Sequence, residues 1–338
     1  MVLGASGYAG AEVLRFLSSH PGIDVVAAGA ASRVGISLAD FYPSMPFFAG
    51  MVFSSFDDAL GLDADIVFSS LPHTHSMELF GDYHGKVVDL AGDFRLKDAA
   101  AYPVWYGEAH RHPQALDDWT YGLTEIHRDE IRDCSKVANP GCYAAAALLA
   151  LAPVAEAGLV EPSSIHIDGK SGVSGAGRAG GEGFDFVSAN ENSRPYSVTA
   201  HKHIAEIEQE LTSLAGSQVT VSFVPHLVPM NRGVLATCIA QLRQPLSSTD
   251  LEDLYRTRYG QEHFITVLGE PSLPETKRVS GTNFAEVAAR VDDRTSRVIA
   301  MCAIDNLGKG AAGQAIQNAN LMLGLPENTA LDVAGMVA

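Results

Sequence analysis

The chain has 338 residues, of which 46% are hydrophobic and 19% charged, and its formal net charge is −17. This length and balance fit two packed domains and exclude a chain dominated by disorder. The acidic surplus argues against nucleic acid and anionic membrane surfaces, because both attract a positive field. An anionic small-molecule substrate would therefore need a local cluster of Arg or Lys.

The N-terminal sequence has neither the basic region nor the apolar core of a signal peptide, and no apolar run approaches the ~18 residues of a membrane span. The cysteines are too few and too scattered for a disulfide framework or for paired metal ligands; they are Cys134, Cys142, Cys238 and Cys302. We therefore expect a cytoplasmic protein with reduced thiols, one of which can be reactive.

The first half of the chain alternates short apolar strands with helices. Val13, Phe16 and Leu17 have helical spacing within residues 11–19. Strands are predicted at residues 1–3, 24–30, 64–69 and 86–90. This alternation predicts an α/β fold with a Rossmann-type, doubly wound parallel sheet. Because so few residues precede the first glycine, either the first strand is unusually short or the natural chain starts upstream.

The second half has a different texture, because its strands alternate in polarity. Such strands are predicted at residues 164–168, 218–225, 233–242 and 297–304. They predict an α+β domain with a mixed, largely antiparallel sheet. A last helix, at about residues 311–323, is expected to pack back on the first domain.

The segment Gly4–Gly10, with the sequence Gly-Ala-Ser-Gly-Tyr-Ala-Gly, spaces glycines three residues apart at the first strand-to-helix turn. A tight bend and the close approach of backbone N–H groups to a pyrophosphate both require missing side chains there. The helix N-terminus adds partial positive charge. A tight turn alone would also explain the glycines, but the strand before and the amphipathic helix after them favour a dinucleotide site. Its expected residues are Gly4, Ser6, Gly7, Tyr8 and Gly10.

The end of the second strand, where a dinucleotide's ribose is usually recognised, carries Ser32 and Arg33. An acidic residue at this position is typical of NAD, whereas a hydroxyl and a cation suit the extra phosphate of NADP. Asp24 lies at the other end of the strand, away from the ribose. The sequence therefore favours NADP(H) as cofactor.

Cys142 follows Asn139-Pro140-Gly141 and precedes the strong helix former Ala144–Leu151. This places the thiol at a helix N-terminus, where the dipole lowers a thiol pKa and the sulfur is exposed. A small buried hydrophobe is the alternative interpretation. Cys134 lies in a polar loop and the remaining two cysteines in apolar strand-like runs, which is typical of structural residues.

A thiolate nucleophile needs a proton-transfer partner, and His201 and His203 are the candidates. The sequence does not choose between them. Three His-x-His pairs occur, but no cysteine or carboxylate completes a recognisable ligand pattern, so we expect no metal site. The pairs are His73/His75, His110/His112 and His201/His203.

The glycine-rich segment Ser171–Arg178 follows a predicted strand and offers backbone N–H donors to an anion. A flexible surface loop is the alternative. The cations expected to surround a phosphorylated substrate are Arg95, Arg178, Lys202 and Arg232.

Several segments together resemble the N-acetyl-γ-glutamyl-phosphate reductase family of the aspartate-semialdehyde dehydrogenase-like superfamily. The resemblance spans nearly the whole chain, and the last two of its segments are the most specific. The family usually has proline where this chain has Ala144 and Ala205, which puts loop rigidity in doubt rather than the chemistry. The segments are Gly4–Gly10, Leu71–His73, Asp93–Leu96, Tyr121–Leu123, Asn139–Tyr143, Ser171–Arg178, His201–His203, Val224–Met230 and Asp305–Ala315.

The resemblance implies that NADPH reduces N-acetyl-γ-glutamyl phosphate through a thioester on Cys142, with His201 or His203 as acid and base. It implies a homodimer or homotetramer. Its NADP-binding Rossmann domain would span residues 1–141, completed by a C-terminal helix at 306–338, and a catalytic and oligomerisation domain would span 142–305. Further expected cofactor residues are Leu71, Pro72, Ser171, Gly172 and Asn306; expected substrate residues are Arg95, Asn139 and Arg178.

Three other functions remain open at this stage. The homologous reductase of N-acetyl-aminoadipyl phosphate, in lysine biosynthesis, acts on a substrate one methylene longer, and a methylene is worth only ~1–3 kcal/mol in a pocket. Aspartate-semialdehyde dehydrogenase fits the specific C-terminal segments less well. A non-catalytic NADP-binding sensor would be expected to have lost Cys142 and the histidines.

Overall fold

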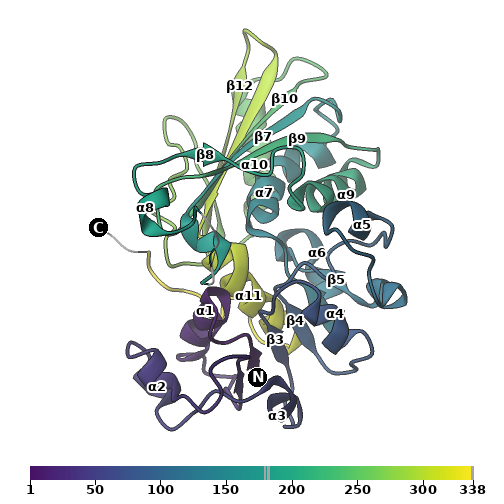
Figure 1. The fold of residues 1–338 in the computed structure, drawn as a ribbon. Coiled ribbons are helices and arrows are strands. Elements are labelled where there is room, and N and C mark those ends of the chain that lie inside the picture. The colour runs from purple at the N-terminus through teal and green to yellow at the C-terminus, as the bar shows by residue number, and fades with distance from the viewer. Residues whose placement is uncertain (179, 181–182, 336–338) are drawn as a thin grey trace.

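The structure, a computed structural model, describes residues 1–178, 180 and 183–335. Two β-sheets lie one above the other in the view of Figure 1, and helices pack between and around them. The first sheet comes from the first half of the chain and the second from residues beyond 164. Among the described residues, no helix is long and apolar enough to cross a membrane.

The first sheet has six strands in the order β2-β1-β3-β4-β6-β5, and every neighbouring pair is parallel. This confirms the predicted Rossmann-type sheet. The order reverses at β1, so the chain leaves β1 and β3 in opposite directions and opens a crevice at their carboxyl ends. The strands are β1 (Val2–Leu3), β2 (Ala28–Gly29), β3 (Val67–Ser69), β4 (Val87–Asp89), β5 (Thr120–Tyr121) and β6 (Lys136–Ala138).

Helix α1 begins at the glycine turn and buries Val13, Phe16 and Leu17, as their spacing predicts. Short helices connect the later strands. The helices of this half are α1 (Tyr8–Leu17), α2 (Leu38–Phe41), α3 (Phe56–Leu60), α4 (His75–Phe80), α5 (Ala101–Trp105) and α6 (Thr124–Asp133).

The last helix, α11 (Gly313–Met322), lies against α1 and α6, and its Ile316 shares a hydrophobic cluster with Val13. A π-helical turn, η4 (Gly308–Ala312), precedes it. The helix predicted at about residues 311–323 is thus confirmed. It does not extend through the 306–338 segment, because Gly324, with a φ of +70°, and Pro326 prevent its continuation. Residues 336–338 lie outside the described residues.

The second sheet has seven strands in the order β11-β12-β13-β10-β7-β9-β8. Its β11–β12 and β7–β9 pairs are parallel and its other pairs antiparallel, which confirms a mixed, largely antiparallel sheet. The strands are β7 (Ile165–Ser171), β8 (Arg194–Pro195), β9 (Val221–Leu227), β10 (Val234–Gln241), β11 (Ile265–Val267), β12 (Ala285–Asp292) and β13 (Arg297–Ile304).

Helix α7 (Cys142–Glu156) is the centre of the second half, because every residue from Tyr143 to Ala155 is buried. A helix that is apolar all round belongs in a core, and α7 packs on β10, β13 and α9. Its first residue, Cys142, emerges where the two sheets face each other. The other helices here are α8 (Phe186–Ala189), α9 (His203–Ala215) and α10 (Ser248–Tyr259).

The face of the second sheet that points away from α7 is only half-buried. Along β10 the residues alternate between buried and partly exposed, and the partly exposed set includes Leu235 and Ile239. Ile299 and Met301 continue this apolar face on β13.

Candidate active site

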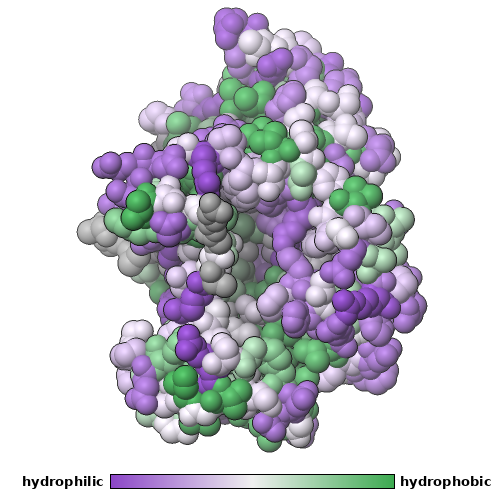
Figure 2. All heavy atoms as spheres, viewed as in Figure 1, coloured by the Kyte–Doolittle hydropathy of each residue, from purple (hydrophilic) through white to green (hydrophobic). Residues whose placement is uncertain are grey.

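A cavity of about 360 Å³ lies between the two sheets, and both halves of the chain contribute to its wall. Figure 2 shows a hollow where the half of the chain that carries the first sheet meets the half that carries the second. Eleven of the residues predicted from the sequence line this cavity: Tyr8, Leu71, Arg95, Asn139, Cys142, Ser171, Gly172, His201, Lys202, His203 and Asn306. The remaining predicted residues lie outside its wall.

The glycine turn has the geometry expected of a dinucleotide cradle. Gly4 has a φ of +73°, and a Cβ there would lie 2.2 Å from the carbonyl oxygen of Ser70. A Cβ on Gly10 would lie 2.4 Å from the carbonyl oxygen of Gly4. These two glycines therefore allow the turn to pack closely on β3 and α1, while Gly7 forms the N-cap of α1. The free N–H groups at this helix start suit a pyrophosphate.

Arg33 and Arg178 meet at the ring of Phe41, with guanidinium carbons 5.4 and 5.3 Å from its centroid. Arg178 also donates hydrogen bonds to the carbonyl oxygen of Ser6 (2.9 Å) and to the hydroxyl of Tyr42 (3.3 Å). Arg178 was expected beside the substrate, but the structure places it over the glycine turn. Its position in the sequence could not reveal these contacts, because the loop Ser171–Arg178 belongs to the second half of the chain whereas Ser6 and Tyr42 belong to the first.

Arg232 also lies away from the cavity wall. Its guanidinium bridges Glu12, at 2.6 Å, and Asp305, at 2.8 Å, which ties α1 to the end of β13. Two carboxylates already neutralise this cation. Arg232 is therefore not among the cations available to a substrate in this structure.

Asn306 fixes the glycine-rich loop against the cavity. Its side-chain oxygen accepts a hydrogen bond from the N–H of Gly233 (2.8 Å), and its Nδ2 donates to Ser174 Oγ (3.0 Å). A Cβ on Gly172 would lie 2.6 Å from the carbonyl oxygen of Asn231, so the loop packs tightly on the neighbouring turn. Ser171 and Gly172 are held at the cavity wall as a result.

Cys142 is the first residue of α7 and is partly buried. Burial raises the pKa of its thiol to about 11, because the thiolate would lose its hydration. The N–H of Tyr143 and the charge of Arg95 act in the opposite direction but are weaker. The pKa of the Cys142 thiol is therefore raised rather than lowered as expected from its place at the helix N-terminus, because desolvation is the largest influence on it.

A buried ion pair holds the loop before Cys142. Glu206 is fully buried and accepts hydrogen bonds from Arg95 Nη1 (3.0 Å), the hydroxyl of Tyr121 (3.0 Å) and the N–H of Gly141 (2.9 Å). Arg95 also donates to the carbonyl oxygen of Asn139 (2.8 Å). Glu206 thus fixes the peptide directly before the nucleophile. The sequence analysis missed it, although its spacing from His203 places both on one helix face.

Asn139 is bonded within the protein as well. Its Nδ2 donates to the carbonyl oxygen of Ala311 (3.0 Å), and its side-chain oxygen accepts from Asn318 Nδ2 (3.1 Å). These contacts join the loop of the nucleophile to η4 and α11.

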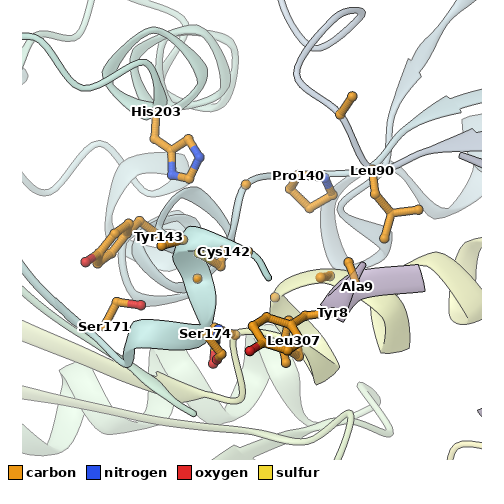
Figure 3. A pocket seen from close by; sticks show the side chains of 18 of the residues that line it. Tyr8, Ala9, Leu90, Pro140, Cys142, Tyr143, Ser171, Ser174, His203 and Leu307 are labelled. Carbon is orange, nitrogen blue, oxygen red and sulfur yellow. Dashed lines mark hydrogen bonds between the residues drawn. The ribbon is translucent and has the colours of Figure 1, made fainter. Parts of the chain in front are cut away.

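His203 lies closest to the nucleophile's loop, since a Cβ on Gly141 would lie 2.3 Å from its Nε2. In Figure 3 its ring points from the start of α9 toward Cys142. Its Nδ1 is buried and has no hydrogen-bond partner among the described residues. His201 differs, because its Nδ1 accepts a hydrogen bond from the N–H of His203 (3.2 Å).

Burial lowers the pKa of His201 to about 4, with a smaller contribution from Arg95. Burial also lowers the pKa of His203 well below its usual value, assisted by the charges of His201, Arg95 and Lys202. Both rings are therefore neutral at neutral pH and can accept a proton. Cys142 is therefore a neutral thiol beside neutral imidazoles rather than part of a thiolate–imidazolium ion pair.

This protonation state predicts the pH dependence of alkylation. Because the thiolate reacts and the thiol pKa is raised, the rate at which iodoacetamide modifies Cys142 should rise roughly tenfold per unit between about pH 7 and pH 9. Stopped-time mass spectrometry of the Cys142 peptide measures this rate. A rate that is already constant above about pH 7.5 would contradict it and would indicate a thiolate stabilised by the helix.

Comparisons with known proteins define the class. Residues 1–134 match the family described as "Semialdehyde dehydrogenase, NAD binding domain", and residues 142–306 match "Semialdehyde dehydrogenase, dimerisation domain". Aspartate semialdehyde dehydrogenase II from Vibrio cholerae shares the fold, with a TM-score of 0.73 at 20% identity, covering 96% of this chain and 97% of that chain. The enzyme with NADP from Candida albicans gives 0.68 at 20% identity, covering 97% and 98%. The fold is that of semialdehyde dehydrogenases.

Closer relatives narrow the class. The N-acetyl-gamma-glutamyl-phosphate reductase of Symbiobacterium thermophilum is 46% identical over 99% of this chain and 98% of its own. The enzyme of the same name from Halothermothrix orenii is 44% identical with the same coverage. The chain belongs to the N-acetyl-gamma-glutamyl-phosphate reductase family, which confirms the resemblance seen in the sequence.

Proposed function

We propose that the protein reduces N-acetyl-γ-glutamyl phosphate to N-acetylglutamate 5-semialdehyde and phosphate with NADPH, a step of arginine biosynthesis. The observation that supports this most directly is the single cavity in which Cys142, His203 and the glycine-turn residue Tyr8 face one another (Figure 3). This arrangement brings a nucleophile, a proton carrier and a dinucleotide cradle to one point.

The first chemical step belongs to Cys142 and His203. The thiol gives its proton to the imidazole as the sulfur attacks the acyl carbon, and the carbon–oxygen bond to phosphate then breaks, leaving a thioester. His203 is the better proton carrier of the two histidines, because its Nδ1 is unpartnered among the described residues whereas that of His201 binds a backbone N–H. Backbone N–H groups at the start of α7 suit the developing oxyanion.

The second step converts the thioester to the aldehyde. NADPH, when bound, supplies the hydride that the thioester carbonyl can accept and a carboxylate cannot. Cys142 then leaves from the resulting thiohemiacetal, and the protonated His203 returns its proton to the sulfur. The carbon–sulfur bond breaks and the site regains its neutral thiol and imidazole.

We place the cofactor's phosphates at the glycine turn and its ribose phosphate near Ser32 and Arg33. Arg178 joins this cofactor side rather than the substrate side, in view of its contacts with Ser6 and Tyr42. Leu71 and Pro72 follow β3 at the crevice, so they stay candidates for the nicotinamide end, together with Ser171, Gly172 and Asn306.

On the substrate side, Arg95 and Asn139 remain candidates although both are bonded within the protein. Arg95 has three hydrogen bonds to Leu90, Asn139 and Glu206, and a guanidinium carries five N–H donors. Two donors are thus left for a substrate oxygen.

These placements give the two domains different roles. We propose a cofactor domain of residues 1–141 with the 306–338 segment and a catalytic and oligomerisation domain of residues 142–305. A homodimer or homotetramer would use the half-buried apolar face around Leu235 and Ile299. The match to a dimerisation domain supports this assembly. The cytoplasm stays our proposal for the compartment, from the sequence alone.

The test is the reverse reaction, in which purified protein reduces NADP with N-acetylglutamate 5-semialdehyde only when phosphate is present. The shorter aldehyde should be preferred over N-acetyl-aminoadipate semialdehyde by roughly 10- to 100-fold in kcat/KM, the value of one methylene in a fitted pocket. Preference for the longer aldehyde would assign the protein to lysine synthesis. NADP binding without turnover would indicate a sensor.

A further inference from the structure

A buried chain of side-chain amides connects the last helix to the loop that carries the nucleophile. Asn318, on α11, is fully buried, and its Nδ2 donates to the carbonyl oxygen of Gly122 (2.8 Å) and to the side-chain oxygen of Asn139 (3.1 Å). Asn139 in turn donates from its Nδ2 to the carbonyl oxygen of Ala311 (3.0 Å), in η4. Cys142 follows Asn139 closely in the sequence, so the chain of hydrogen bonds ends beside the nucleophile.

The hydrogen bonds of this chain can run in only one direction. The carbonyl oxygen of Gly122 can only accept, so Asn318 must turn its Nδ2 toward it. The other end of the Asn318 amide, its Oδ1, accepts from the hydroxyl of Thr124 (2.7 Å) and from Gln314 Nε2 (3.2 Å). Because Asn318 Nδ2 is a donor, Asn139 must present its oxygen to it and its own N–H groups to η4. Asn318 therefore dictates how the Asn139 amide is oriented.

The surroundings leave this arrangement little freedom. A Cβ on Gly122 would lie 2.6 Å from Asn318 Nδ2, so the amide lies directly against the backbone. Every polar atom of Asn139 has a protein partner, because its N–H also donates to the carbonyl oxygen of Asp89 (2.8 Å) and its carbonyl oxygen accepts from Arg95 Nε (2.8 Å). A close-packed interior transmits a local change to its neighbours, so a change in Asn318 must reach Asn139.

Asn139 joins the two segments that enclose the nucleophile. Its backbone belongs to the loop that leads into Cys142 at the start of α7, and its side chain binds η4. A Cβ on Gly310, in η4, would lie 2.8 Å from the Cβ of Cys142, so this turn lies directly against the nucleophile. We infer that Asn318 is a positioning residue: by orienting the Asn139 amide, it fixes the loop before Cys142 against η4 and so sets where the sulfur lies. The inference rests on the proposed function.

Asn318→Asp tests the inference because it keeps the size of the side chain and removes its donor. The Asn139 amide is expected to turn its N–H groups toward the new carboxylate and to lose its hydrogen bond to Ala311. The kcat of the reverse reaction should fall at least about tenfold, because a misplaced nucleophile loses its reactive alignment. The KM values for phosphate and aldehyde and the affinity for NADP should stay within about threefold of wild type.

Asn320→Asp is the matched control on the same helix. Asn320 is also fully buried and donates to two backbone carbonyls, those of Glu327 (3.1 Å) and Thr329 (3.0 Å). Within the part of the chain that the structure describes, none of its hydrogen bonds reaches the loop before Cys142. Asn320→Asp should lower the urea midpoint of unfolding about as much as Asn318→Asp but leave kcat within about twofold of wild type. An equal loss of kcat in both variants would assign Asn318 a merely structural role and overturn the inference.

A double-mutant cycle in kcat tests whether Asn318 acts through Asn139. In the Asn139→Ala background, Asn318→Asp should change kcat by less than about threefold, because the connection is already lost. Two losses that multiply would contradict the inference, as would a wild-type kcat in Asn318→Asp alone. If Asn318→Asp does not fold, Thr124→Val decides instead. It removes one donor to Asn318 and should lower kcat at least about threefold, whereas an unchanged kcat would count against the inference.

Alkylation by iodoacetamide reports the position of the sulfur without turnover. A loosened loop admits water to the thiol, so Asn318→Asp should raise the rate for Cys142 at pH 8 at least about threefold. The rate for Cys134, which does not line the cavity, should stay unchanged. An unchanged rate for Cys142, or an equal rise at both thiols, would overturn the inference. If the rate for Cys142 alone rises but wild-type protein shows no phosphate-dependent reaction, the proposed function fails and the positioning of Cys142 by Asn318 stands.

Discussion

Replacing Cys142 by serine is expected to lower kcat by about three orders of magnitude or more in both directions. The serine hydroxyl is a far weaker nucleophile than a thiolate, and the ester it would form accepts hydride less readily than a thioester. Steady-state assays of the forward and reverse reactions measure the loss. NADP affinity should be unchanged within about twofold, because Cys142 lies at the start of α7 rather than in the glycine turn.

Cys134→Ser provides the matched control for this substitution. Cys134 is also partly buried, but its thiol donates a weak hydrogen bond to the carbonyl oxygen of Ile131 (3.4 Å) and does not line the cavity. Its replacement should leave kcat nearly unchanged. Substantial activity in Cys142→Ser would exclude a covalent intermediate on this residue.

Four strands of the first sheet, β1 to β4, could be predicted because they are buried and lie in short apolar runs. The short strands β5 (Thr120–Tyr121) and β6 (Lys136–Ala138) were missed. The strand β12 (Ala285–Asp292) could not be predicted either, since its sequence contains alanines, a glutamate and an arginine with weak strand preference. Pairing with β13 along its whole length determines this strand. Such non-local pairing has no signature within the segment itself.

The candidate site was predictable where residue type alone indicates chemistry. Cys142 after a Pro-Gly turn and the histidine segment fall in this group. The contact between Arg95 and Glu206 joins residues 111 positions apart, so no local pattern reveals that this cation already has a partner. Arg178 and Arg232 were predicted to bind the substrate for the same reason. In the structure Arg178 contacts Ser6 and Arg232 contacts Glu12, both in the half of the chain that carries the glycine turn.

The thiol pKa shows a different kind of failure. A cysteine at a helix start is expected to have a low pKa from local geometry, but here the surrounding residues remove water from the sulfur. A helix made almost entirely of buried residues places its first side chain near the core as well. The local dipole was therefore predictable, while the desolvation depends on how the two sheets meet.

Lys309→Met is expected to lower the free energy of unfolding by about 3–5 kcal/mol. Lys309 is fully buried, and its Nζ donates to Glu125 Oε1 (2.6 Å) and Gln317 Oε1 (2.7 Å), which joins η4 to α6 and α11. Removing the ammonium leaves the carboxylate of Glu125 buried without its counter-charge. Equilibrium urea denaturation, followed by far-UV circular dichroism, measures the change in unfolding free energy.

The double variant Lys309→Met with Glu125→Gln separates the stranded charge from the loss of packing. It should recover part of the lost unfolding free energy, because the amide no longer demands a cation, whereas the exposed control Lys277→Met should stay within about 0.5 kcal/mol of wild type. A loss below about 1 kcal/mol in Lys309→Met would contradict the prediction.

The Lys309–Glu125 ion pair also supports the active site, because it holds η4 next to the nucleophile: a Cβ on Gly310 would lie 2.8 Å from that of Cys142. Loosening η4 should therefore slow turnover in molecules that still fold.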